Sequence, residues 1–595
     1  MKQICNFITI LILSLVFTIV ANAVAAKTLY DDFSGNYINP QKWNQHELVI
    51  KVANGKLLSK VGNSADVDDV RNITVFQNPA SIDIIECDVI VFQAVLDTGT
   101  NSQSVARVDG RFYNTLNDGT EKGDIWAGVF IGDQGNGIEA WWEVWEAIDD
   151  NGDSWEEKKI ETLVVPGLAY GQPYKVKIDY DGNNNFTFSV HGVSGSFTGL
   201  ARQAAANAPY KGLETVVYTD NGAGNGFVSA SFDNVYINSQ ASAYDEFSTT
   251  HLDQTKWQNL EFVREIENGK VRLMSHSTGE RENALIGFSE ISPYVEATVK
   301  IKNNSMIDPG DRGIARISGY FYNDTYGPGD HNEYEGNVWA AININYYGDG
   351  TLNAECTGLR TLDAADTQWD NLFYRKFNLP IILDRTYKLS MRFTGSKLFF
   401  TCKDTVTGRI DFYAYEISTP IYESYNQSMS LRSRVYGDST GGKMVVEFDD
   451  VYVDVAEPGA TYDANGDWEL TVSNLWANSG CDLPDASDDD ITITQNGNDI
   501  TFVVHDDYGT TLEGNVYGDT YTFKMTEESN GETEIKYGVF TLSDSTSGAG
   551  NVTFVWFDDT DSCESGFSIS MTKSPTDDGG GGGGGGGCFI PTLIQ

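Results

Sequence analysis

The chain has 595 residues, a formal net charge of −45 and 60 glycines. This length exceeds what one hydrophobic core supports, and it predicts about three to five domains. The acidic charge argues against nucleic-acid binding, because phosphates need a basic surface, whereas it suits neutral glycans or divalent cations held by carboxylates.

Residues 1–26 have the pattern of a secretory signal. Lys2 supplies a positive start, an apolar run extends from Phe7 to Val20, and small residues follow up to Ala26, so cleavage is expected before Lys27. The apolar run is shorter than the roughly 20 residues that a spanning helix needs. We therefore expect a secreted protein, extracellular or at the cell surface, with no transmembrane span in the mature chain.

The sequence after the signal contains one pattern twice. Tyr30-Asp31-Asp32-Phe33 returns as Tyr244-Asp245-Glu246-Phe247, and Lys42-Trp43 returns as Lys256-Trp257, both at a spacing of 214. The closing segment Phe232–Tyr236 likewise recurs as Phe448–Tyr452. A period of this length indicates duplicated domains, since solenoid repeats are far shorter. The predicted units are residues 27–240 and 241–457.

Each unit consists of short runs with period-two alternation, such as Tyr174–Asp179 and Tyr387–Arg392, which predict half-buried strands. Turn pairs such as Asn54-Gly55 separate these runs. No long stretch has the apolar period of a helix. Each unit is therefore predicted to be a sandwich of antiparallel sheets, with roughly a dozen strands.

The motifs that open and close each unit resemble the concanavalin-like jelly-roll superfamily. The resemblance rests on Asp31–Ser34 with Lys42-Trp43 following, on Asn54–Leu57 at a strand entry, and on the closing segment Phe232–Ile237. That superfamily includes legume-type lectins, laminin-G modules and laminarinase-type glycoside hydrolases. The resemblance implies two tandem concanavalin-like jelly-roll sandwiches, and it implies a fold more firmly than an activity.

The most suggestive segment in the first unit extends from Glu139 to Glu146. On a strand Glu139, Trp141, Glu143 and Trp145 share one face, so carboxylates lie beside indoles. One interpretation is a sugar-binding strand, with Trp141, Trp142, Trp145 and Glu143 as the ligand contacts. Another is a retaining glycosidase, which needs two carboxylates about 5 Å apart, with Glu139, Glu143 and Glu146 as candidates. The third interpretation is an ordinary sandwich strand.

Two observations weaken the catalytic interpretation. The laminarinase-type pattern Glu-x-Asp-x-x-Glu has a tryptophan here in place of its aspartate. The second unit has Leu352, Ala354 and Cys356 at about the positions of Glu139, Trp141 and Glu143, so at least one copy is expected not to catalyse. Trp126 and Trp339 occur in both copies and are expected to pack in the cores.

Carboxylates at the ends of each unit suggest structural calcium. First and last strands of a jelly roll often lie side by side, which would pair Asp32 with Asp233 and Glu246 with Asp449. The alternative is that these carboxylates are simple edge-strand charges. No other cofactor is expected.

Residues 458–574 are predicted to form a small lipocalin-like β-barrel. Short strands such as Trp468–Val472 and Val552–Trp556 alternate with hairpin turns such as Asn496-Gly497, and a meander of about eight strands suits a closed barrel. The resemblance is to lipocalin-like domains of bacterial secreted proteins. Cys481 and Cys563 are expected to form a disulfide there, whereas Cys356 and Cys402 are a second candidate pair in the second unit.

Residues 575–595 form a tail with an unbroken glycine run from Gly579 to Gly587, followed by Cys588-Phe589-Ile590. Polyglycine is a flexible tether. The tail resembles bacterial C-terminal sorting tails built around a Cys-Phe-Ile box, but it lacks their alanine-rich continuation. It is therefore either a surface attachment processed at Cys588 or a truncated relic.

These patterns favour an all-β, non-catalytic protein that binds polysaccharide, extracellular matrix or a cell-envelope glycan. A glycoside hydrolase or polysaccharide lyase is the first alternative, and a structural surface protein is the second.

Overall fold

The computed structural model of the chain describes residues 28–574 with short gaps. The gaps are residues 36, 64–68, 97–101, 220–225, 278–281, 307–310, 327–332, 437–441, 455–459, 478–480, 485–488, 498, 506–509, 518–519, 530–531 and 558–561. The predicted signal and the tail with Cys588 lie outside the described residues. The described part is all-β apart from one 3-10 helix, η1 (Pro79–Ser81). Among the described residues no helix is long and apolar enough to cross a membrane.

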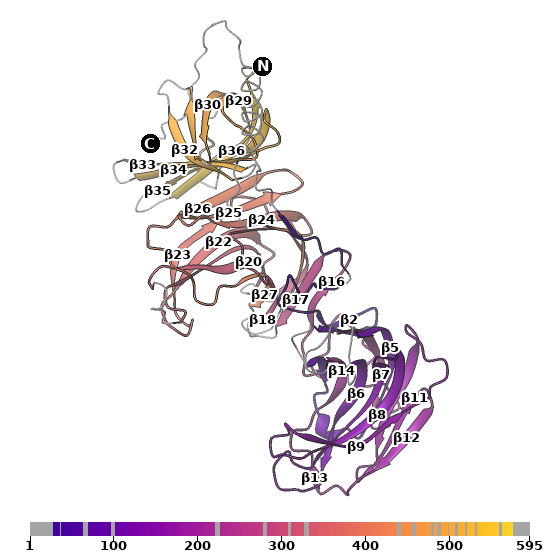
Figure 1. Ribbon diagram of the computed structural model, residues 1–595. Coiled ribbons are helices and arrows are strands. Elements are labelled where there is room, and N and C mark those ends of the chain that lie inside the picture. Colours follow the sequence, from indigo (N-terminus) through magenta and orange to yellow (C-terminus); the bar gives the residue numbers. More distant parts are fainter. Residues whose placement is uncertain are drawn as a thin grey trace, which may run out of the picture.

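One sheet of fifteen strands extends through the lower and middle parts of the molecule in Figure 1. Its first half contains, in spatial order, β12 (Val193–Thr198), β11 (Asn185–Val190), β10 (Pro173–Tyr180), β5 (Ile84–Leu96), β15 (Gly226–Ile237), β3 (Lys56–Asn63) and β2 (Leu48–Ala53). Its second half continues with β16 (Phe262–Ile266), β17 (Val271–Ser277), β28 (Gly442–Asp454), β19 (Tyr294–Met306), β24 (Thr386–Phe393), β25 (Lys397–Asp404) and β26 (Ile410–Glu416), and β1 (Thr28–Asp31) pairs with β28.

A smaller sheet covers each half. The first contains β4 (Asp69–Val75), β14 (Lys211–Tyr218), β6 (Gln103–Asn114), β7 (Asp124–Asp133), β8 (Ile138–Ala147) and β9 (Trp155–Thr162), with β13 (Ala204–Ala205) beside β6. The second contains β18 (Glu282–Gly287), β27 (Met429–Tyr436), β20 (Arg312–Asn323), β21 (Asn337–Tyr347), β22 (Leu352–Thr361) and β23 (Trp369–Lys376). Each smaller sheet and its half of the large sheet form a β-sandwich, called here the first and the second sandwich. The large sheet has the same strand order in both, read outward from the junction of β2 and β16.

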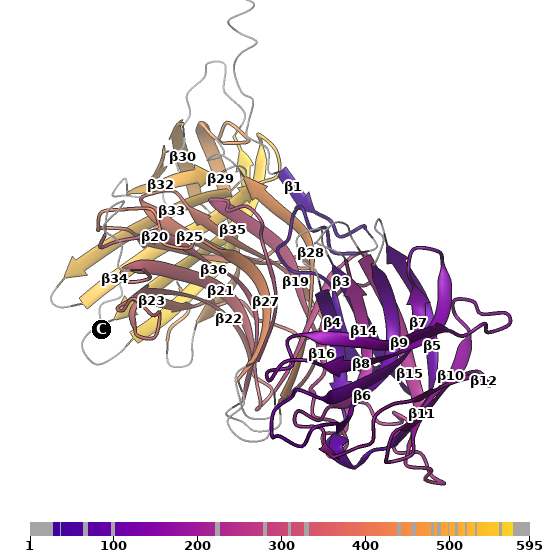
Figure 2. The same ribbon diagram turned by 60° about the horizontal axis from the view of Figure 1, so that its bottom comes forward.

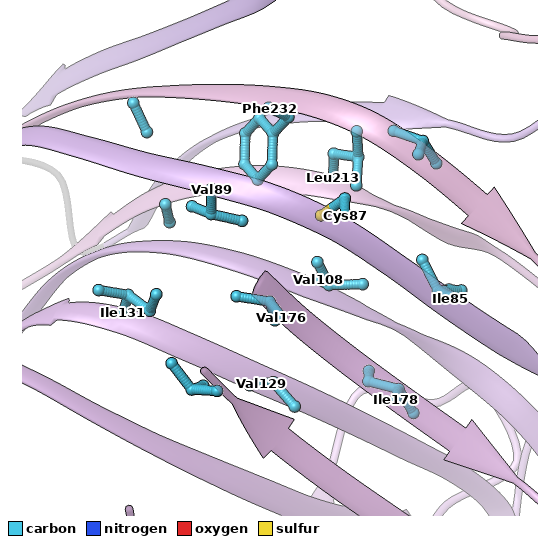
Figure 3. Close-up of a cluster of buried hydrophobic side chains, with 14 of the residues drawn as sticks. Ile85, Cys87, Val89, Val108, Val129, Ile131, Val176, Ile178, Leu213 and Phe232 are labelled. Atoms are coloured by element: carbon cyan, nitrogen blue, oxygen red, sulfur yellow. The ribbon is translucent and has the colours of Figure 1, made fainter. Parts of the chain in front are cut away.

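The core of the first sandwich lies between its two sheets, as Figure 3 shows. Strand β5 alternates buried and half-buried residues, which directs Ile85, Cys87 and Val89 inward. Val108 and Val129 meet them from the smaller sheet. This alternation is what period-two sequence patterns predict for a strand with one face in a core.

The segment that opens each sequence repeat packs into the other sandwich. β1 pairs with β28, and Phe33 and Trp43 are buried in the core of the second sandwich. Phe247 and Trp257 are buried in the core of the first. Figure 2 shows the indigo β1 beside strands of the second sandwich. The predicted boundary at residue 240 therefore divides the sequence repeats, whereas the packed bodies exchange their opening segments across it.

Both opening segments are held by the same contact. The indole Nε1 of Trp43 donates to Asp31 Oδ2 at 2.7 Å, and that of Trp257 donates to Asp245 Oδ2 at 2.7 Å. All four residues are buried, and a buried donor and acceptor must find partners. The recurring Tyr-Asp and Lys-Trp motifs are thus joined by one buried hydrogen bond in each repeat.

A closed eight-stranded barrel completes the described chain. Its strands are β29 (Gly466–Ala477), β30 (Asp489–Asn496), β31 (Asp499–Val504), β32 (Thr511–Tyr517), β33 (Thr520–Ser529), β34 (Glu532–Leu542), β35 (Ser547–Phe557) and β36 (Ser562–Lys573). The barrel rests on β26 of the second sandwich, where Val539 packs with Phe399 and Phe412, and Asn551 donates to the carbonyl of Ile410.

The cysteines pair in only one of the two suggested ways. A disulfide joins Cys481 to Cys563 in the barrel, with their Cα atoms 5.6 Å apart. Cys356 and Cys402 are free and buried in the core of the second sandwich. The second candidate pair was wrong, because both thiols serve as small apolar core residues.

Candidate functional site

The suggestive segment of the first unit is strand β8, and its side chains alternate between two environments. Trp142 lies in the core between the sheets, stacked on Phe188 with ring centroids 4.5 Å apart. Trp141 and Trp145 lie on the opposite side, on the face of the smaller sheet that points away from the core. We call this side the outer face. Trp142 was expected to contact a ligand, but the strand period turns it into the core instead.

Glu143 accepts hydrogen bonds from two indole rings on the outer face. Its Oε1 accepts a hydrogen bond from Trp141 Nε1 at 2.7 Å, and its Oε2 accepts one from Trp145 Nε1 at 2.8 Å. Glu143 is 8% exposed and Trp141 is 1% exposed. The carboxylate therefore fixes the two rings, and both of its oxygens are occupied.

The other two candidate carboxylates lie apart from Glu143. Glu146 accepts a hydrogen bond from Thr115 Oγ1 at 2.8 Å and pairs with Lys158 Nζ at 2.6 Å. Glu139 shares the face of Glu143, with Trp141 between them along the strand. The three carboxylates thus have separate surroundings, without the shared pocket that a catalytic pair needs.

The outer face of the first sandwich is filled by its own aromatic rings. Phe130 stacks on Trp141 with centroids 5.0 Å apart, and Val105 and Val216 complete the same buried cluster. Trp126 lies in this cluster and donates from Nε1 to the Tyr210 hydroxyl at 2.7 Å. Trp126 is therefore buried as expected, although on the outer face and not between the sheets.

Arg107 is buried in this face and neutralised there. Its Nε donates to Glu214 Oε2 at 2.7 Å and lies 3.2 Å from Asp109 Oδ2. Burial works to lower the pKa of Arg107, but Glu214 and Asp109 outweigh burial and raise it above its ordinary value. Burial, followed by the charge of Glu214, raises the pKa of Asp109. This face is therefore both filled and charge-balanced.

The outer face of the second sandwich contains an open groove of about 460 Å³. Its floor is formed by β20, β21, β22 and β27, and Trp369 and Tyr374 of β23 stand at its side. The groove exists because the matched residues are smaller or more polar. Phe130 pairs with Trp141 across β7 and β8, whereas Asn343 pairs with Glu355 at the equivalent place across β21 and β22.

The strand pairing in the structure changes which residues of the two repeats correspond to one another. Residues on β8 and β22 are matched through their pairing partners on β7 and β21. On this register Glu139, Trp141 and Glu143 correspond to Asn353, Glu355 and Thr357. The sequence comparison assigned Leu352, Ala354 and Cys356, one residue out, and a one-residue shift moves every side chain to the other face. Ala354 and Cys356 accordingly lie in the core.

The floor of the groove is a chain of polar contacts. Arg316 Nε donates to Asn343 Oδ1 at 2.7 Å, and Asn343 Nδ2 lies 3.3 Å from Glu355 Oε1. The Tyr374 hydroxyl donates to Glu355 Oε2 at 2.8 Å. Glu355 is 4% exposed, so its carboxylate interacts mainly with these protein groups and little with solvent.

The side of the groove presents aromatic rings to solvent. Trp369 is 47% exposed and Tyr374 is 61% exposed. Asp366 orients the tryptophan, because its Oδ1 accepts from Trp369 Nε1 at 2.9 Å and its Oδ2 accepts from the Tyr320 hydroxyl at 2.6 Å. Large exposed rings held in place by hydrogen bonds are typical of ligand sites.

Trp339 also lines the groove, half-buried beneath Arg316, whose guanidinium carbon lies 4.9 Å from the ring centroid. The expectation that it packs in the core was wrong. Its repeat partner Trp126 is covered by aromatic neighbours, which the second sandwich lacks at the matched positions.

Arginines outnumber carboxylates in the groove. Arg312, Arg316, Arg432 and Arg434 line it together with Glu355 and Asp366. Burial, assisted by the positive charges of Arg432 and Arg312, lowers the pKa of Arg316 to about 10. Arg434 is 3% exposed, and its Nε makes no hydrogen bond within the described part of the chain. Sequence reasoning missed these residues, although their alternation on two strands was visible.

The carboxylates proposed for calcium are not brought together as expected. Asp32 follows β1 in the second sandwich, whereas Asp233 lies on β15 of the first. Glu246 lies in the opening segment that packs against the first sandwich, whereas Asp449 lies on β28 of the second. Lys56 Nζ pairs with Asp233 at 2.7 Å, and Lys270 Nζ pairs with Asp449 at 2.6 Å. Across the described ranges, no group of three or more His, Cys, Asp or Glu side chains is placed to hold a metal.

Comparisons with known proteins identify no family. No family model matches the chain, and no curated protein matches it. Among solved structures, it is similar to the LG1–3 region of the laminin α2 chain, at 8% identity over 85% of this chain and 93% of that chain, with a TM-score of 0.17. A legume lectin-like domain from Entamoeba histolytica is 14% identical over 31% of this chain and 84% of its own, with a TM-score of 0.21.

A third similar structure is the κ-carrageenase from Pseudoalteromonas carrageenovora in complex with an oligotetrasaccharide of κ-carrageenan. It is 10% identical over 32% of this chain and 82% of its own, with a TM-score of 0.19. Similarity at this level assigns no function, so function must be argued from the groove itself.

Proposed function

We propose that this chain is a secreted or cell-surface carbohydrate-binding protein, without catalytic activity, that holds a polysaccharide or a cell-envelope or matrix glycan in the groove of the second sandwich. The observation that carries the proposal is the open groove with Trp369 and Tyr374 at its side and a hydrogen-bonding floor. Aromatic faces take the apolar faces of sugar rings, and polar floor residues take their hydroxyls. The groove volume falls within the range of roughly 300–1,000 Å³ common for small-ligand sites.

The state of the carboxylates supports binding over catalysis. Glu355 accepts hydrogen bonds from Asn343 and Tyr374. Asp366 accepts one from Trp369 on one oxygen and one from Tyr320 on the other. A glycosidase needs one carboxylic acid and one carboxylate that both reach the scissile bond. Carboxylates engaged on both oxygens serve better as supports for neighbouring rings.

A binding screen tests the proposal. The mature chain is applied to a glycan array, and the Trp369→Ala variant is compared with Trp155→Ala, because Trp155 and Trp369 occupy matched positions beside Ala147 and Thr361. We expect glycan binding that Trp369→Ala abolishes and Trp155→Ala preserves. Absence of binding to any glycan would favour the structural surface protein instead.

The enzyme alternative has its own assay. A hydrolase or lyase acting through Glu139, Glu143 or Glu146 would turn over laminarin or similar polymers, and Glu143→Gln would remove that turnover. We expect no turnover, because the two indole contacts of Glu143 hold its oxygens.

Surface attachment through Cys588 is a further part of the proposal, supported by the glycine run and the Cys-Phe-Ile segment of the sequence. Mass spectrometry of the native C-terminus tests it. A cleaved or modified Cys588 is expected, and an intact, unmodified tail would contradict attachment.

A further inference from the structure

The groove of the second sandwich is positive on a strongly negative protein. Four arginines and two carboxylates line it, whereas the chain carries a formal charge of −45. On the described part of the same face of the first sandwich, the buried arginine contacts two carboxylates, Asp109 and Glu214. There Arg107 is paired with Glu214, while the equivalent pair across β20 and β27 is Arg316 with Arg432.

The arginines are placed where their charges oppose one another. Arg316 and Arg432 are directly opposed Cα partners in the pairing of β20 with β27, and Arg434 follows two residues later on the same face. Like charges directly opposite in a sheet are destabilising. Glu355 supplies negative charge to this group, with its Oε1 4.0 Å from Arg312 Nη1, and one buried carboxylate is thus shared among several arginines. An arrangement that is costly in the unliganded protein is explained if a bound anion completes it.

Within the described part of the chain, the buried guanidinium of Arg434 has an unused hydrogen-bond donor. Arg434 is 3% exposed and lines the groove, its guanidinium carbon lies 4.5 Å from the Tyr436 ring centroid, and its Nε makes no hydrogen bond among the described residues. Buried polar groups in folded proteins almost always have partners. A ligand atom with acceptor character in the groove would supply the partner that Arg434 Nε lacks among the described residues.

We infer that the ligand of this groove is an anionic glycan, whose carboxylate or sulfate groups pair with Arg316, Arg432 and Arg434 while its sugar rings contact Trp369 and Tyr374. This inference rests on the proposed function and specifies its ligand class. Guanidinium matches carboxylate and sulfate oxygens through paired hydrogen bonds. Neutral sugars would add no negative charge to a groove that four arginines and two carboxylates line. A nucleic acid also carries anions and would meet the same repulsion from the acidic protein as a charged glycan, so an oligonucleotide is included in the test.

Isothermal titration of the mature chain tests the inference with three carbohydrate probes: oligogalacturonide for carboxylates, dextran sulfate for sulfates, and unmodified dextran, which is the neutral form of the sulfated probe. We expect one or both charged probes to bind, and dextran to bind at least tenfold more weakly. Binding of the charged probe should weaken as salt rises, because screening reduces the attraction. Preference for one charged probe identifies which anion the groove takes.

Variants locate the interaction. Arg434→Gln is expected to weaken the charged probe roughly 10- to 100-fold, the range that a charge-assisted hydrogen bond supplies. Arg434→Lys keeps the charge and should retain part of the affinity, and Arg432→Gln provides a second, less buried test. Arg71→Gln removes one charge from the first sandwich, where Arg71 is half exposed, and should leave affinity unchanged.

The outcomes separate the two claims. Equal binding of charged and neutral probes would overturn the anionic inference and leave carbohydrate binding standing. Binding of none of these probes, with an empty glycan array, would contradict the proposed function itself. Tighter binding of a single-stranded oligonucleotide than of every glycan probe would overturn the assignment of glycan as the ligand.

Discussion

Val49 and Val263, which are equivalent residues of the two sequence repeats, are each other's Cα partners in the pairing of β2 with β16. A residue that pairs with its own repeat equivalent marks a local two-fold axis. The contacts around it obey this symmetry: Glu47 Oε1 accepts from Ile266 N at 3.0 Å, and Glu261 Oε1 accepts from Val52 N at 2.8 Å. The two sandwiches are therefore related as the subunits of a symmetric dimer are, within one chain.

The exchange of opening segments predicts which sandwich each buried tryptophan stabilises. Trp43→Ala should loosen the second sandwich and Trp257→Ala the first, each by about 3–5 kcal/mol, because both rings are nearly fully buried. Hydrogen exchange checks this: β18 and β27 should exchange faster in Trp43→Ala, and β4 and β14 in Trp257→Ala. Faster exchange of β4 and β14 in Trp43→Ala would mean that the segments are not exchanged.

The junction between the sandwiches is predicted to depend on pH through Glu47. Burial raises its pKa from 4.5 to about 7, although Lys60 works in the opposite sense. Between these values the folded protein keeps a proton that the unfolded chain has lost, so stability falls as pH rises from about 4.5 to 7. The full effect is about 3 kcal/mol by order of magnitude.

Denaturant unfolding from pH 4.5 to 7.5 measures this difference between wild type and Glu47→Gln, which keeps the acceptor for Ile266 and removes the titration. The wild type should lose stability relative to the variant as pH rises. Its symmetry mate provides the control, because Glu261→Gln removes the ion pair with Lys443 at 2.9 Å and should destabilise the chain at pH 7. Parallel curves for wild type and Glu47→Gln would contradict the prediction.

The barrel disulfide is predicted to stabilise the barrel. It closes a loop with a sequence separation of 82, which corresponds to about 4 kcal/mol in the chain-entropy account. Cys481→Ser and Cys563→Ser should lower the unfolding midpoint equally, and reduction of the wild type should match them. A reductant that leaves the barrel transition unchanged would show that the bridge contributes little.

Calcium is predicted to have no effect on thermal unfolding. The expected acidic pairs are split between sandwiches, and Asp233 and Asp449 are already neutralised by Lys56 and Lys270. Melting temperatures in calcium and in chelator should therefore agree. A rise with calcium would restore the original expectation, with Asp32 or Glu246 among its ligands.

The strand patterns and motifs of the sequence were sufficient to predict the sandwiches and the barrel, because period-two alternation and turn residues are local signals. Tyr174–Asp179, for instance, lies in β10 with Tyr174, Val176 and Ile178 buried. The exchange was not predictable in this way. The contact of Asp31 with Trp43 and that of Asp245 with Trp257 each lie within one opening segment, so neither motif indicates which core its segment enters.

The candidate site was harder to predict than the fold. The sequence comparison matched Glu143 with Cys356 instead of Thr357. This error of one residue replaced a side chain of the outer face by one of the core face. The groove itself depends on side-chain size on several strands at once, as Phe130 and Asn343 show. The alternating arginines of β20 and β27 were the signal that the sequence offered, and they acquire meaning only when the strands are known to be neighbours.

Side-chain oxidation footprinting tests the central claim, that the second sandwich and not the first binds the glycan. Trp369 is 47% and Tyr374 is 61% exposed, so both should oxidise readily in the unliganded chain, as should Tyr170 of the first sandwich at 37%. With a bound anionic oligosaccharide, oxidation of Trp369 and Tyr374 should fall severalfold while Tyr170 and Trp155 stay unchanged. Protection of Trp145 and Trp155 with Trp369 still reactive would place the glycan on the first sandwich and contradict the account.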